Sequence, residues 1–117
     1  MQERPIFITL AGQRVPLWCD IFVLNEVQEE FETISAFERK LVGLKEKEDG
    51  FVKTEPDMRA IMVALPLMIR EGIKKMEAIG EPVEIDVNRV LLDADMPFVM
   101  LADKLHEAYK RCFLSKK

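Results

Sequence analysis

Residues 58–76, MRAIMVALPLMIREGIKKM, decide the fold. Apolar residues recur there every three or four positions and keep one side of a helix apolar as far as Gly80. At about 1.5 Å per residue the predicted helix is roughly 35 Å long, so it is the expected spine of a small domain. Pro66 lies inside it and has no N–H to donate, so we expect a kink there.

Two apolar segments rich in β-branched and aromatic residues lie near the N-terminus, IFITL (6–10) and VPLWC (15–19). Gly12 lies between them and can take the positive φ of a tight turn, so residues 5–19 are predicted to form a β-hairpin. Pro16 cannot donate a hydrogen bond to a ladder, so its strand is expected at an edge or to begin after it.

Two shorter helices are expected between the hairpin and the long helix. Asp20 is the expected N-cap of the first. The residues expected to face inward in that helix are Ile21, Leu24, Val27 and Phe31. Residues 35–38, SAFE, form a capping-box pattern that predicts the start of the second helix, and Gly43 its end. The charged run KEKEDG (45–50) is predicted to be a mobile surface loop.

Start signals also precede the remaining helices. Thr54 or Glu55 stands where a cap of the long helix would lie, with Pro56 suited to its first turn. Asp86 is expected to cap a short helix, and Asp95 to cap a closing helix that has an early proline and runs to the region of Cys112 and Phe113.

These elements predict an α+β fold that is mostly α. An N-terminal β-hairpin (5–19) is followed by four to five helices (20–114) around one long central helix. The chain has 117 residues, which is the length of one domain, so residues 1–117 are interpreted as a single domain.

Side chains for catalysis or metal binding are scarce, with one His, one Tyr and two Cys. Cys19 and Cys112 are too few for a zinc site, and His106 does not share a helix face with Cys112 six residues later. We therefore expect no catalytic site, no metal and no cofactor, and a protein that is not an enzyme. Both cysteines are expected to be reduced, although their spacing alone does not exclude a disulfide.

Charge is unevenly distributed although the formal net charge is only −4. Acidic residues dominate positions 1–38, and basic residues dominate positions 103–117. A solvated surface with cations near a helix C-terminus explains this pattern, and head-to-tail attraction in a homo-oligomer is the alternative. No apolar run is long enough to cross a membrane and the first residues do not form a secretory signal, so we expect a cytoplasmic protein.

Methionines concentrate on the long helix, and methionine-rich faces are typical of adaptable peptide-binding grooves. The residues predicted to line such a groove are Met58, Met62, Met68, Phe98 and Tyr109. The alternative is that the methionines fill gaps in the core.

The order of the segments ITLAGQRVPLWCD (8–20), IFVLNEVQEEF (21–31), TISAFERKLVG (33–43) and MRAIMVALPLMIREGI (58–73) resembles the tail assembly chaperones of long-tailed phages and prophages. That resemblance implies a small α+β fold in the cytoplasm of a bacterial host. It also implies binding to the tape-measure protein while tail-tube subunits polymerise, and a contact with the tail-tube protein is a further expectation. Members of this family are often made in a short form and a frameshifted long form.

The alternative function is a small helical regulator that binds DNA or another protein. Its support is the basic tail with Lys110, Arg111, Lys116 and Lys117. The negative net charge argues against nucleic acid, because proteins that depend on phosphate contacts are usually basic.

Overall fold

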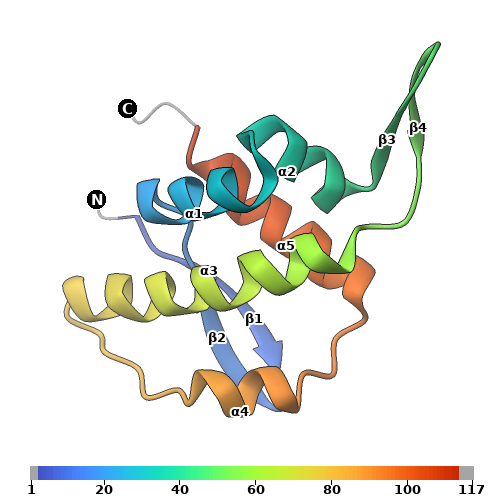
Figure 1. Cartoon of the computed structure of the whole chain (residues 1–117). Coiled ribbons are helices and arrows are strands. Elements are labelled where there is room, and N and C mark those ends of the chain that lie inside the picture. Colours follow the sequence, from blue (N-terminus) through green and yellow to red (C-terminus); the bar gives the residue numbers. More distant parts are fainter. Residues whose placement is uncertain (1–2, 114–117) are drawn as a thin grey trace.

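The computed structural model describes residues 3–113, and it has the predicted α+β, mostly α architecture (Figure 1). The strands are β1 (Ile6–Leu10), β2 (Gln13–Leu17), β3 (Leu44–Lys47) and β4 (Gly50–Lys53). The helices are α1 (Ile21–Phe31), α2 (Ile34–Val42), α3 (Met58–Ala78), α4 (Val87–Leu92) and α5 (Phe98–Arg111). The strands pair as two separate antiparallel hairpins, β1–β2 and β3–β4.

The central helix α3 is confirmed as the spine of the fold. Helices α1 and α2 lie on one side of it, and the β1–β2 hairpin and α4 lie on the other, while α5 crosses it (Figure 1). Its buried residues are Ala60, Ile61, Ala64, Leu65, Met68, Ile69, Gly72 and Met76. Pro66 lies within the helix and does not end it, and a bend at this residue stays a prediction.

Strand β2 packs closely against α3 at Gly72. A Cβ on this glycine would overlap the carbonyl oxygen of Pro16 and lie 2.7 Å from its carbonyl carbon. The Trp18 N–H donates a hydrogen bond to the Met68 carbonyl, 3.1 Å away, and so ties the end of the hairpin to the helix. Only a residue without a side chain allows this approach of two backbones.

The N-terminal hairpin is confirmed, with Ile8 opposite Val15 in its register. Its turn residues Ala11 and Gly12 both have positive φ, 52° and 77°, as a tight type I′ turn requires. In β1 the buried side chains alternate, Ile8 and Leu10. In β2 the three consecutive residues Val15, Pro16 and Leu17 are all buried, because Pro16 lies against α3.

The prediction that residues 45–50 form a loop is wrong, their surface position is confirmed, and their mobility stays a prediction. These residues form most of the β3–β4 hairpin, which extends beyond the helices (Figure 1). Lys47 pairs with Gly50 across a two-residue turn, and Gly50 has a φ of 120°. Every residue of both strands is exposed, so no alternation of apolar and polar residues marked them in the sequence.

Several helix starts also differ from prediction. The N-cap of α2 is Thr33, whose Oγ1 accepts from the Ala36 N–H at 2.9 Å, and not the capping box at 35–38. Asp57 caps α3 in place of Thr54 or Glu55, and Pro56 precedes that cap.

The closing helix α5 begins after Pro97 without a side-chain cap. The Asp95 carboxylate, which was expected to cap it, instead accepts a hydrogen bond from the Ala11 N–H at 3.0 Å. It therefore links the loop before α5 to the turn of the first hairpin. Asp20 and Asp86 cap α1 and α4 as predicted, and Gly43 ends α2.

The core of the described residues is apolar, and no charged or polar side chain among residues 3–113 is buried. Phe37 is its largest fully buried side chain and packs against Phe31 and Tyr109, with ring centroids 5.5 and 5.8 Å away. Within the same residues no helix is long and apolar enough to cross a membrane.

Candidate functional site

The structure divides the five residues predicted to line a groove into two groups. Met58 and Met62 are one turn apart on α3 and are 47% and 67% exposed. Phe98, at the start of α5, is 38% exposed. Met68 and Tyr109 are buried, Met68 completely. The prediction that these last two line an open groove is therefore wrong, because both belong to the buried core. Met68 lies on the part of α3 that packs against the end of the first hairpin, and Tyr109 on α5 packs against Phe37 of α2.

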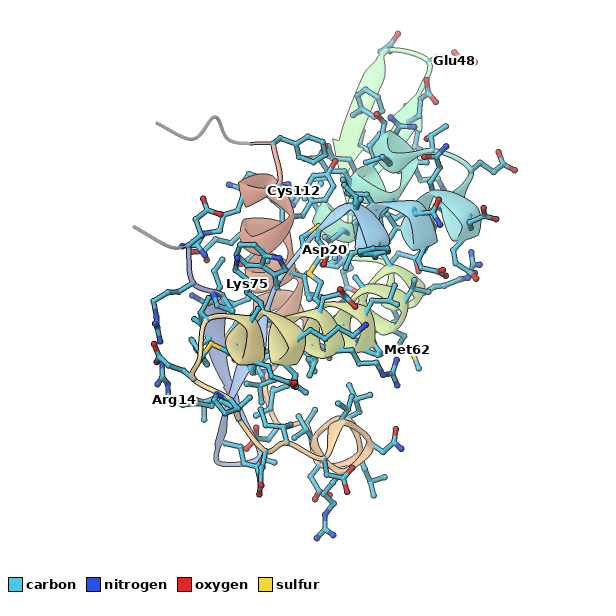
Figure 2. The ribbon with its side chains drawn as sticks, turned by 90° about the vertical axis from the view of Figure 1, so that its left-hand side faces the viewer. Arg14, Asp20, Glu48, Met62, Lys75 and Cys112 are labelled. Carbon is cyan, nitrogen blue, oxygen red and sulfur yellow. The ribbon has the colours of Figure 1, made fainter. Side chains whose placement is uncertain are left out.

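Met58 and Met62 border an open apolar cleft of about 280 Å³ between α3, α4 and the first turn of α5. We call it the α3–α4–α5 cleft. Its lining residues are Met58, Ile61, Met62, Leu65, Pro66, Leu91, Ala94 and Leu101. The first turns of α3 and α5 and the end of α4 meet at this end of the molecule (Figure 1), and Figure 2 shows Met62 at the surface of α3.

Sequence reasoning missed the contributions of α4 to this cleft. Leu91 lines it, while the neighbouring Leu92 is 80% exposed. The sequence did contain a signal for an exposed leucine on α4. Leu91 and Leu92 are adjacent, and adjacent residues of a helix do not face the same side. Val90 is the residue with which α4 packs into the core.

A second open cavity, of about 530 Å³, lies between α1 and α3. Ile21 and Phe22 are exposed on α1 instead of packing inward, so the expectation for Ile21 is wrong; Val23 is buried in its place. This cavity is lined by charges of both signs, including Glu26, Arg70, Glu71 and Lys74. It also has apolar lining residues, among them Phe22, Val23 and Leu67, so it differs from the α3–α4–α5 cleft in the charged side chains of its lining.

Glu71 in this second cavity has a raised pKa. Burial is the main cause, and a hydrogen bond with the Asp20 side chain adds to it. Lys74, whose Nζ is 3.0 Å from the Glu71 carboxylate, opposes the shift. The carboxyl therefore gains a proton more easily in the folded chain than in the unfolded one.

His106 contacts Glu38 and Tyr109. Its Nε2 is 2.8 Å from the Glu38 carboxylate, and its ring stacks on Tyr109 at a centroid distance of 5.8 Å. The Tyr109 hydroxyl points to the other Glu38 oxygen, and burial together with that carboxylate raises the pKa of Tyr109 to about 12. This polar contact joins α2 to α5.

Three or more side chains that could share a metal ion do not cluster anywhere in residues 3–113. In comparisons with known proteins, no family model, no curated protein and no solved structure matches this chain. The α3–α4–α5 cleft is therefore the candidate site on the strength of its geometry and chemistry alone.

Proposed function

We propose that this chain is a non-catalytic assembly chaperone for a phage or prophage tail, acting in the cytoplasm of a bacterial host. In this proposal the α3–α4–α5 cleft binds an apolar helical segment of the tape-measure protein. The resemblance in the order of segments motivates the choice of partner, and the exposed Met58 and Met62 beside an open apolar cleft are the observation that carries it.

The chemistry of the cleft fits an amphipathic helix as its occupant. Its lining side chains are all apolar, and open apolar clefts rimmed by exposed apolar residues mark protein-binding sites. A partner helix would place residues spaced three and four apart into it, in the helix-in-groove mode. Methionine side chains rotate about three bonds, so Met58 and Met62 can adapt to anchors of different shape.

The acidic surface of α1 supports a chaperone role in a second way. Glu26, Glu29, Glu30 and Glu32 are exposed on or beside this helix, away from the cleft. A tape-measure protein exposes long apolar stripes before assembly, and a negatively charged chaperone surface would keep the complex in solution. The excess of negative charge, −4 for the chain, is consistent with this role.

The proposal can be tested by co-expressing the full chain with the product of the neighbouring tape-measure gene and measuring the affinity of the purified complex. We expect Met62→Asp to weaken binding by at least about tenfold, because it places a charge in the apolar cleft. The matched control is Ile21→Asp, the same kind of change at an exposed apolar residue outside this cleft.

Both variants alter an exposed side chain, so circular dichroism should show the wild-type fold for each. Failure of the wild-type chain to form a complex would overturn the proposed function. Equal weakening by Met62→Asp and Ile21→Asp would leave the partner in place but refute the assignment of the cleft.

A further inference from the structure

The fold brings together the two cysteines that lie near opposite ends of the chain. Cys19 immediately precedes Asp20, the N-cap of α1, and Cys112 is the C-cap of α5. Both line one cavity of about 230 Å³, and Cys112 is close enough to contribute to the raised pKa of Cys19. Figure 2 shows Cys112 beside the start of α1, close to Asp20.

The two thiols differ in their access to solvent. Cys19 is buried, and Cys112 is half-buried at the end of its helix; neither is in a disulfide. Burial and the neighbouring Cys112 raise the pKa of Cys19, so Cys19 holds its proton at neutral pH. Cys112 is therefore the thiol that a reagent in solution reaches first.

We propose that Cys19 and Cys112 form a reversible redox site, in which a low-molecular-weight disulfide such as oxidised glutathione converts the pair into an intramolecular disulfide. The bond would fasten the end of α5 to the connection between β2 and α1. This proposed redox site goes beyond the proposed chaperone function and does not depend on that function.

The reaction takes two exchange steps. The Cys112 thiolate attacks one sulfur of oxidised glutathione, forms a mixed disulfide and releases one glutathione thiolate. The Cys19 sulfur, after losing its proton to solvent, then attacks the Cys112 sulfur and releases the second glutathione. The two cysteines lose two electrons and two protons, and one glutathione disulfide becomes two glutathione thiols.

The size of the expected effect follows from the thermodynamic linkage between folding and disulfide formation. A disulfide that fits the native fold stabilises it, and the native fold must then favour the disulfide by the same factor. For a closed loop of about 90 residues, the chain-entropy account gives a factor on the order of a thousand.

The test equilibrates the full chain with mixtures of reduced and oxidised glutathione, once in native buffer and once in concentrated urea. Mass spectrometry after acid quenching measures the fraction with a Cys19–Cys112 bond, and thiol titration checks it. We expect the equilibrium constant for the intramolecular disulfide to be larger in native buffer, approaching about a thousandfold. The melting temperature of the oxidised chain should be higher and should return to the starting value with dithiothreitol.

The proposal would be overturned if the equilibrium constant for the disulfide in native buffer were equal to or smaller than that in urea, because the fold would then not favour the bond. A stable mixed disulfide at Cys112, or disulfide-linked dimers, as the main native product would also overturn it. The single variants Cys19→Ala and Cys112→Ser identify the bond, because neither can form the intramolecular product, and their melting temperatures should not rise under oxidation.

Discussion

Gly72→Ala is a sharp test of the packing between β2 and α3. Glycine inside a helix is less favourable than alanine by about 1 kcal/mol, so helix propensity alone predicts a more stable variant. The structure predicts the opposite, because the added Cβ would overlap the carbonyl oxygen of Pro16 and lie 2.7 Å from its carbonyl carbon. These atoms belong to a backbone that cannot rotate away.

The size of the effect follows from three terms. Overpacking against a rigid neighbour costs about 1–3 kcal/mol. Moving the strand away also stretches the 3.1 Å hydrogen bond from the Trp18 N–H to the Met68 carbonyl, worth about 1 kcal/mol. The gain in helix propensity, about 1 kcal/mol, offsets part of this. We expect a net loss of about 2 kcal/mol, which corresponds to a melting temperature lower by about 10 °C for a domain of this size.

Urea unfolding followed by fluorescence is the suitable assay, because Trp18 is the single tryptophan of the chain and lies at this contact. The control compares Arg70→Ala with Arg70→Gly, at an exposed interior position of the same helix, where alanine should be the more stable by about 1 kcal/mol. The close approach of β2 to α3 would be refuted if Gly72→Ala were as stable as the wild type while Arg70→Ala remained more stable than Arg70→Gly by the expected amount.

Three further predictions concern other parts of the fold. Gly43→Ala should lower the free energy of unfolding by about 1–3 kcal/mol in urea titrations, because Gly43 has a φ of 78° and a Cβ there would lie 3.0 Å from the Glu55 carbonyl carbon. Phe37→Ala should lower it by about 3–5 kcal/mol and leave part of the chain unfolded by circular dichroism. The pKa of Glu71 is raised in the folded chain, so its ionised carboxylate destabilises the fold. This destabilisation is absent at low pH and grows as the pH rises through the range in which carboxyl groups ionise. Glu71→Gln should therefore raise the melting temperature at pH 7 and have no such effect below about pH 4; equal effects at both pH values would contradict the shift.

Elements that depend on local hydrogen bonds could be predicted from the sequence. Asp20 accepts from the N–H groups of Phe22 and Val23, two and three residues along the chain, so its role as a cap needs no knowledge of the rest of the fold. The sequence pattern predicts the start of α2 two residues too late, because Thr33 and Ser35 are both good caps. Local rules do not decide between two adequate candidates, and tertiary packing selects one.

The candidate site could be predicted only in part, because burial on α3 depends on distant segments. Periodicity placed Met62 and Met68 on one broad apolar stripe. The end of the β1–β2 hairpin is tied to α3 at Met68 by the hydrogen bond from Trp18, and Met68 is buried. Met62 instead borders the open cleft, where α4 and the first turn of α5 leave it exposed. The partners that separate an exposed methionine from a buried one lie far away in sequence, and no helical pattern identifies them.

The same reasoning explains why the open cleft lies where it does. The β1–β2 hairpin and α5 cover the middle of α3, and both contribute several buried side chains to the shared core. The first turns of α3 face α4, which has six residues, and Val90 is its only buried residue. A helix of that length is marginal without tertiary contacts, and segments with few buried contacts open at low free energy. In the proposed function, α4 could therefore shift to admit a partner helix beside Met58 and Met62 while the core of the domain stays intact.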